Sequence, residues 1–206
     1  MTQGVNVPAV YVAVEIEAPL EAVWDRTQQP DPHARWDLRF SRIEYLPRSN
    51  EDEPQRFLYA TRIGFGLKIR GEGAFVGTKQ TIDGSRTTAL RFWCDDRRSL
   101  VRSGCGYWRY IPNERGVTFL TRFDYETRFG LAGALLDRVV FRPLVGWATA
   151  WSFDRLRLWL ERELEPETSR RRLLPRARRC RRRPAPARVR RRTLPRVSPA
   201  APARTC

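Results

Sequence analysis

The alternation of apolar and polar residues predicts a strand near the start of the chain. Over residues 10–16, Val10, Val12, Val14 and Ile16 alternate with Tyr11, Ala13 and Glu15, and a period of two is typical of a half-buried strand. Helical spacing follows, with Pro19 suited to the first turn of a helix that Pro30 ends. Asp31 and Pro32 predict the start of a second short helix.

Residues 38–129 show the strand pattern almost throughout, interrupted by short turn sequences such as DGS, DDRRS and NERG. Such turns join antiparallel neighbours. The predicted strands are 39–47, 56–65, 67–77, 87–94, 100–111 and 116–129. In the last predicted strand, one face is expected to point inward, and every second residue, including Leu120, is expected to face water. The inward face comprises Val117, Phe119, Thr121, Phe123, Tyr125 and Phe129.

Residues 131–164 return to helical spacing, with Pro143 dividing a short stretch from a longer one. Leu144, Trp147, Trp151 and Leu158 form an apolar stripe that needs an apolar surface to cover. The predicted fold class is therefore α+β: a curved sheet of seven antiparallel strands closed by a long C-terminal helix, with two short helices after the first strand. A curled sheet closed by one helix leaves a space between them.

Charge divides the chain into two parts. Residues 166–206 hold 15 of the 39 basic residues and only one of the 23 acidic residues, together with seven prolines. This composition predicts a disordered Arg/Pro/Ala-rich tail over 166–206, following a folded, nearly neutral domain over 8–165. A shifted reading frame in a GC-rich gene would also produce such a tail, and composition leaves both explanations open.

The opening VEIEAPLEAVWDRTQQPDPHARWDLRFSRIEYL and the closing WATAWSFDRLRLWLE resemble the SRPBCC superfamily, the helix-grip proteins that include START lipid-transfer domains, birch-pollen-allergen-like proteins and bacterial polyketide cyclase/dehydrase-type domains. The resemblance covers about residues 8–165. It implies a helix-grip fold with a cavity for a hydrophobic or amphipathic, lipid- or polyketide-like molecule. The fold hosts binding proteins and enzymes alike, so a polyketide cyclase/dehydrase-type enzyme is the alternative.

The candidate ligand-binding residues are aromatic, apolar and hydroxyl side chains on the surfaces expected to face this space. Without the resemblance, a filled core would explain the same side chains. Trp36 is either a lid over the cavity or a staple that holds the second helix to the sheet. Glycine pairs at 71 and 73 and at 104 and 106 either leave room for a ligand or let a strand bend. The candidates are Trp36, Tyr59, Thr61, Ile63, Trp93, Phe119, Thr121, Phe123, Tyr125, Trp147 and Trp151.

Residue types give little support for catalysis, and no catalytic residue is assigned. His33, the single histidine, is expected on the surface and not as a general base. Asp37 is expected to be a cap or turn residue and not an acid catalyst. Asp154 is either a buried acid or, as we expect, an acid at the edge of the stripe that pairs with Arg157. The four cysteines lack C-x-x-C spacing, so we expect no metal site. The sequence also lacks a phosphate-binding loop, so we expect no cofactor.

The predicted partner is a hydrophobic small molecule. Fifteen arginines in the tail would adsorb to an anionic membrane or bind the phosphates of nucleic acid, which makes a basic-tail adaptor to either one a further alternative. Nucleic acid is not the expected partner, because the tail offers no aromatic side chain for base stacking. The first residues lack a signal peptide and no long apolar run occurs, so the expected location is cytoplasmic.

Overall fold

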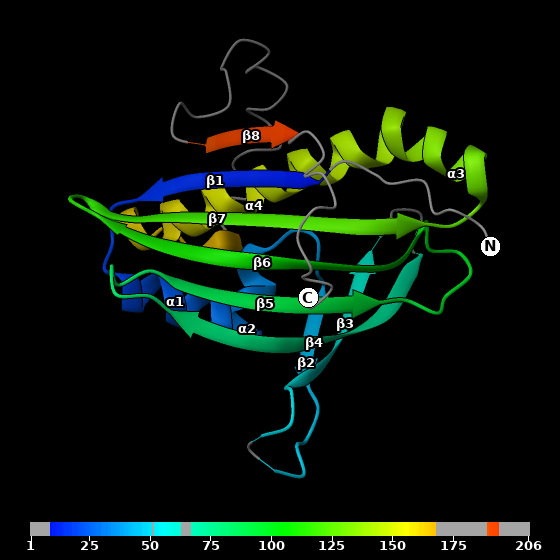
Figure 1. Cartoon of the computed structure of the whole chain (residues 1–206). Helices are drawn as coiled ribbons and strands as arrows, with labels where there is room; N and C mark the ends of the chain where they lie inside the picture. The colour runs from blue at the N-terminus through cyan, green and yellow to red at the C-terminus, as the bar shows by residue number, and fades with distance from the viewer. Residues whose placement is uncertain (1–8, 51, 63–66, 168–188, 194–206) are drawn as a thin grey trace.

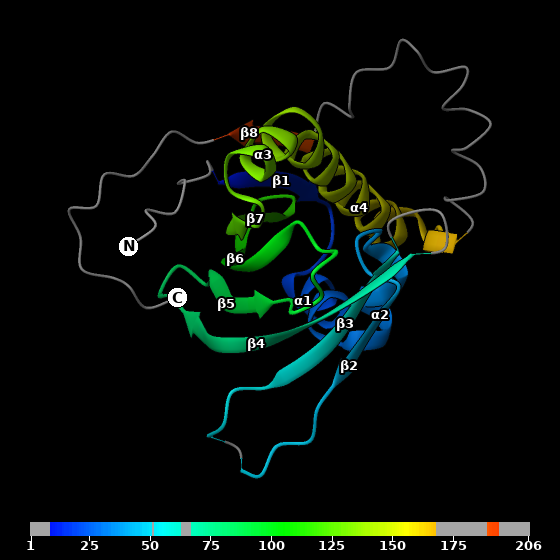
Figure 2. The same cartoon turned by 90° about the vertical axis from the view of Figure 1, so that its right-hand side faces the viewer.

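The computed structural model describes residues 9–50, 52–62 and 67–167 and the backbone of 189–193. One antiparallel sheet curves around a long C-terminal helix, while two short helices lie at one end of the sheet (Figure 1, Figure 2). The predicted fold class, an α+β helix-grip with a seven-stranded antiparallel sheet, is confirmed, and one further strand extends the sheet.

The strands follow chain order across most of the sheet, and β1 closes the series beside β7, giving the order β2-β3-β4-β5-β6-β7-β1-β8. Seven of these strands match the predicted segments, with ends that shift by a few residues. Their bounds are β1 Val10–Ile16, β2 Arg42–Tyr45, β3 Arg56–Arg62, β4 Lys68–Gln80, β5 Arg86–Trp93, β6 Val101–Asn113, β7 Gly116–Thr127 and β8 Val189–Thr193.

The eighth strand differs from the expected irregular tail. The backbone of β8 pairs with β1 in antiparallel register, with Val10 opposite Thr193 and Val14 opposite Val189. Pro166 and Glu167 are also described, whereas the rest of the 166–206 segment lies outside the described residues. The tail's proposed disorder and its basic-adaptor role therefore stay predictions for those positions.

The helices begin close to the predicted positions. Helix α1 spans Leu20–Gln28 and α2 spans Pro30–Trp36, so Pro30 opens the second helix instead of only ending the first. The C-terminal helix comprises α3 Gly130–Leu136, a π-helical turn η1 Asp137–Phe141, and α4 Arg142–Arg162. Pro143 lies where the π-helical turn η1 passes into α4, and the helix runs on without a break. No helix in the described part of the chain combines the length and apolar character needed to span a membrane.

The core lies where α4 packs against β1 and where its Phe153 meets Phe119 of β7. Phe119 and Phe153 stack with their ring centroids 4.5 Å apart, and both are fully buried together with Leu156. Burial of these side chains removes apolar surface from water, at roughly 25 cal/mol per Å², and fixes the helix to one end of the sheet. Leu120, expected to face water, is 8% exposed, whereas Phe129, expected inside, is 61% exposed, because its left-handed backbone (φ 69°) ends the strand.

Glycines allow aromatic rings to lie flat on the concave face of the sheet. The Tyr59 ring covers Gly71 and the Phe57 ring covers Gly73, and a Cβ at either glycine would overlap the ring. Phe92 covers Gly104 in the same way. Rings fill the space above Gly71, Gly73 and Gly104, so these three glycines leave no room for a ligand. Gly106 does line the cavity, as one of the two alternatives expected. A register shift between Phe75 and Gly77 bends β4.

Candidate functional site

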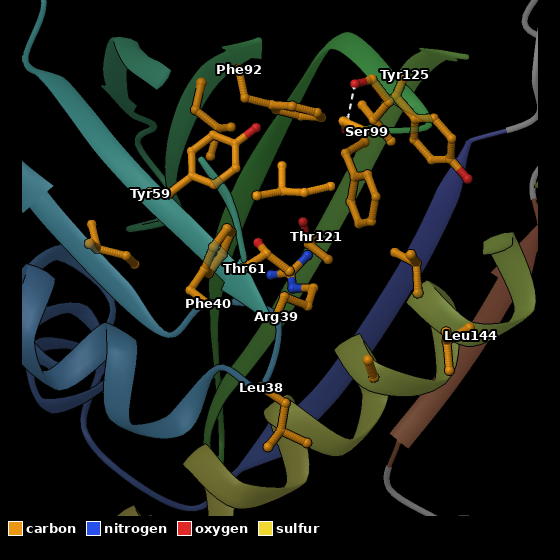
Figure 3. Close-up of a pocket in the computed structure, with 18 of the residues that line it drawn as sticks. Leu38, Arg39, Phe40, Tyr59, Thr61, Phe92, Ser99, Thr121, Tyr125 and Leu144 are labelled. Atoms are coloured by element: carbon orange, nitrogen blue, oxygen red, sulfur yellow. Dashed lines mark hydrogen bonds between the residues drawn. The ribbon is translucent and has the colours of Figure 1, made fainter. Parts of the chain in front are cut away.

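A cavity of about 820 Å³ lies between the concave face of the sheet and the η1–α4 segment. Most of its wall is apolar or aromatic, and residues from the 37–40 loop close one end. Figure 3 shows Tyr59, Phe92, Thr121 and Tyr125 reaching inward from the sheet, opposite Leu144 of α4. A volume of this size falls within the range of roughly 300–1,000 Å³ that is typical of small-molecule sites.

Seven of the predicted ligand-binding residues line this cavity: Tyr59, Thr61, Thr121, Phe123, Tyr125, Trp147 and Trp151. The rings of Trp147 and Trp151 are perpendicular, with centroids 4.6 Å apart, and Trp147 is 46% exposed. These positions follow from the strand and helix periods, but a role in ligand binding stays a prediction for each of them.

Three other predicted residues do not line the cavity. Trp36 is fully buried and donates its indole N–H to the Arg26 carbonyl at 2.8 Å, which makes it a staple between the helices and not a lid. Phe119 packs in the core beneath α4. Trp93 pairs with Glu72 and Ser103 on the convex face, since Phe92 takes the inward position. Ile63 lies outside the described residues.

A polar cluster closes the end of the cavity nearest α2. Asp37, 1% exposed, accepts hydrogen bonds from the Arg39 side chain, from Nε to Oδ1 at 2.9 Å and from a terminal nitrogen to Oδ2 at 2.6 Å. Ser152 of α4 donates to Oδ1 at 3.2 Å, and His33 Nε2 lies 3.2 Å from Oδ2. The carboxylate thus ties the 37–40 loop to both α2 and α4.

The ionisation of this cluster follows from burial and pairing. Burial alone would raise the pKa of Asp37, but the Arg39 charge and the hydrogen bonds from His33 and Arg39 hold it well below its usual range. Burial lowers the pKa of His33 despite the opposing effect of Asp37. At neutral pH the cluster therefore contains an ionised Asp37, a charged Arg39 and a neutral His33.

His33 was expected on the surface, and this expectation is wrong. It is 7% exposed, lines the cavity, and stacks on Trp36 with ring centroids 5.0 Å apart. Trp108 and Phe40 meet its ring edge-on. The aromatic residues on three sides bury the imidazole, and Asp37 supplies the polar partner that burial requires. Asp37 does cap α2, because its backbone N–H donates to the His33 carbonyl.

A second buried carboxylate holds the helix to the sheet beside the cavity. The Tyr125 hydroxyl donates to Asp137 Oδ1 at 2.5 Å, and Arg142 Nε donates to Oδ2 at 3.0 Å. Asp137 is fully buried at the start of η1. Burial and the hydrogen bond to Asp137 raise the pKa of Tyr125, so its hydroxyl keeps its proton. This carboxylate escaped the sequence reading because it belongs to the helix, whereas Tyr125 belongs to the sheet.

The cavity opens to solvent beside η1 and the first turns of α4. Leu136, Val140, Leu144 and Trp147 both line the cavity and remain about half exposed. Four neighbouring apolar residues, in α3, in η1 and at the residue just before α3, are exposed as well: Phe129, Leu131, Leu135 and Val139. Arg62 and Arg98 are lining residues with exposed side chains.

Arg39 is the functional candidate that sequence reasoning missed. It follows Trp36 in a segment predicted as the start of a strand, but the strand begins at Arg42, so residues 37–40 form a loop into the cavity. A signal was present in the i,i+4 spacing of His33 and Asp37, which brings two side chains together on a helix. The predicted pairing of Asp154 with Arg157 at i+3 is confirmed, at 2.7 Å.

Known proteins of the same fold place the chain among the helix-grip proteins. The STAR-related lipid transfer protein of Xanthomonas axonopodis superposes with a TM-score of 0.54 at 16% identity, over 73% of this chain and 84% of that one. The di-domain ARO/CYC protein StfQ from the steffimycin biosynthetic pathway superposes with a TM-score of 0.57 at 13% identity, over 76% of this chain and 52% of that one. Identities this low establish the fold alone.

In sequence, the uncharacterized membrane protein YndG of Bacillus subtilis (strain 168) is 50% identical over 159 residues, which make up 77% of this chain. The chain spans 59% of the length of this curated relative. No protein-family model matches the sequence. Strand order, closing helix and superpositions agree on one conclusion: the chain has the helix-grip fold that is also found in the STAR-related lipid transfer protein and in StfQ.

Proposed function

We propose that the protein binds a hydrophobic or amphipathic small molecule, lipid- or polyketide-like, in the cavity between its sheet and its C-terminal helix. The observation that carries the proposal is the 820 Å³ cavity with a mainly apolar wall and a rim that opens to solvent. Transfer of an apolar molecule into such a space is favourable at roughly 25 cal/mol per Å² of surface buried. The lipid-transfer protein of the same fold supports the proposal.

Mass spectrometry on the full chain tests this function. The protein is purified under native conditions, its intact mass is recorded, and denaturation then releases any bound molecule. We expect a stoichiometric small molecule of apolar or amphipathic character. A folded protein that carries nothing and also fails to take up a neutral hydrophobic fluorophore would contradict the proposal.

A second candidate is an enzyme of the polyketide cyclase or dehydrase type, and the position of His33 favours it. This imidazole lines the cavity in its neutral form and lies 3.2 Å from the buried Asp37 carboxylate, the arrangement that orients a general base. Under this reading the bound molecule is converted, and His33→Gln abolishes turnover while binding persists. If a bound polyketide-like compound leaves the protein unchanged, the binding function alone stands.

A further inference from the structure

We infer that the ligand carries a carboxylate, and that the outer edge of the Arg39 guanidinium binds it inside the cavity. The inference rests on the proposed binding function and names the chemical class of the ligand: an apolar body with a terminal carboxylate, such as a long-chain carboxylic acid.

The geometry of Arg39 leaves donors without a protein acceptor. A guanidinium has five N–H groups, and Asp37 accepts from Nε and from one terminal nitrogen. Within the described residues, the two Asp37 oxygens are the acceptors for the Arg39 side chain. The other three N–H groups, at the outer edge of the guanidinium, have no protein acceptor there. The side chain is 17% exposed and lines the cavity, and Figure 3 shows its nitrogens in the cavity interior, in the same region as the hydroxyls of Thr61 and Thr121.

The neighbours of Arg39 hold this edge in a fixed place. Its central carbon lies 5.4 Å from the centre of the Phe40 ring and 5.6 Å from that of Phe123. Asp37 is fixed in turn by Ser152 and His33. The rings cannot accept strong hydrogen bonds, so once an apolar molecule fills the cavity and displaces water from this edge, the outer N–H groups need another acceptor. A ligand with acceptor oxygens supplies the missing partners.

The charge of the cavity wall selects an anion among such ligands. Among the described residues that line the cavity, four are arginines (Arg39, Arg62, Arg98 and Arg155) and none is acidic. Asp37 lies behind Arg39, and Asp96 pairs with Arg98, so two of these charges are offset. Arg155 donates to the main-chain carbonyls of Arg35, Trp36 and Pro166. A carboxylate matches the fork of a guanidinium with two parallel hydrogen bonds, whereas an ester or alcohol oxygen accepts fewer.

Matched pairs of ligands test the inference on the full chain, stripped of bound molecules, at pH 8. The probes are lauric, myristic and palmitic acids and the methyl ester of each, with affinities measured by displacement of a neutral fluorophore. We expect each acid to bind about tenfold or more tightly than its ester, the difference that one pair of charge-assisted hydrogen bonds produces. Arg39→Met should remove that preference while the esters bind as before.

Two further variants separate Arg39 from the other cations. Arg39→Lys keeps a positive charge opposite Asp37, protects the fold, and should retain only part of the preference because the fork is lost. Arg62→Met, at the rim, should leave most of the preference, because the exposed charge of Arg62 is screened by water and salt whereas Arg39 makes the hydrogen bonds. A preference that survives Arg39→Met but disappears in Arg62→Met would overturn the assignment to Arg39.

The same measurements separate this inference from the proposed function. If acids and esters bind equally well to the unaltered protein, the inference that the ligand carries a carboxylate is wrong, while the proposed binding of a hydrophobic molecule stands. If neither binds, both the ligand class and the binding function are wrong.

Discussion

The Tyr125 hydroxyl donates a hydrogen bond of 2.5 Å to the fully buried carboxylate of Asp137, and this bond joins the last strand of the meander to the π-helical turn of the closing helix. Arg142 pairs with the second carboxylate oxygen. The three residues form a buried latch, named here the Tyr125–Asp137–Arg142 latch, at the point where the helix leaves the sheet and the cavity begins. A π-turn inside a helix often marks a functional position.

Breaking this latch from either side should have unequal effects. Tyr125→Phe removes one hydrogen bond to a charged group and should lower the free energy of unfolding by about 1.5–3 kcal/mol. Asp137→Ala also leaves Arg142, whose side chain is 14% exposed, without its carboxylate, so it should cost about 3–5 kcal/mol. Urea denaturation of both variants measures the difference. Equal losses in the free energy of unfolding would show that the ion pair between Arg142 and Asp137 does not stabilise the fold.

The polar cluster predicts how stability depends on pH. Because the pKa of His33 is lowered in the folded protein, the unfolded chain takes up a proton first, and stability is lost as the pH falls below the ordinary histidine value of about 6.5. The stabilising contribution of Asp37 is present above its unfolded pKa of about 3.9 and is lost as the pH falls toward its much lower folded pKa.

Urea midpoints between pH 8 and about pH 2 test this dependence. We expect a plateau down to about pH 6.5 and then a decline of at most about 1.4 kcal/mol per pH unit from His33. His33→Gln should flatten the upper part of the decline and leave the part due to Asp37. A variant with the same slope as the unaltered protein near pH 6 would contradict the burial of a neutral imidazole.

A charge on the concave face should abolish binding of a neutral ligand. Phe123→Arg places a second guanidinium in the cavity beside Arg39, whose central carbon lies 5.6 Å from the Phe123 ring, and an unpaired charge in an apolar site is costly. Binding of methyl palmitate, followed by fluorophore displacement, should disappear. Leu58→Arg is the matched control on the convex face, where Leu58 is 39% exposed, and it should bind as before. Retained binding in Phe123→Arg would place the ligand elsewhere.

Two tryptophans of α4 should separate affinity from stability. Trp151 lines the cavity, so Trp151→Leu should weaken binding of an apolar ligand about tenfold through lost buried contact. Trp159 is 6% exposed and does not line the cavity. The central carbons of the Arg26 and Arg35 guanidinium groups lie 4.3 Å and 4.7 Å from the centre of its ring. Trp159→Leu should lower the unfolding midpoint and leave the affinity of the folded protein unchanged. The reverse pattern would argue against the cavity as the binding site.

The sequence predicted the fold better than the site because the two depend on different information. Strand and helix periods identify which side chains face inward, and this placed Tyr59, Thr121, Phe123 and Trp151 correctly. Phe92 and Trp93 are adjacent aromatic residues, so the alternation of apolar and polar positions does not indicate which of them faces inward. The hydrogen-bond register of β4 and β5 determines that it is Phe92. The polar end of the cavity depends on tertiary contacts: Asp37 meets Ser152 across 115 positions of sequence, and no local pattern encodes that meeting.

The rings that lie flat over glycines have a consequence for how such proteins diversify. Phe57 and Tyr59 stay against the sheet because Gly73 and Gly71 offer no Cβ. An alanine at either glycine would lift its ring toward the helix and narrow the chamber, although the alanine itself would touch nothing inside it. The width of ligand that the cavity admits is therefore set by residues that lie under the lining rings. Two relatives with identical lining side chains would bind ligands of different width if they differed only at these glycines.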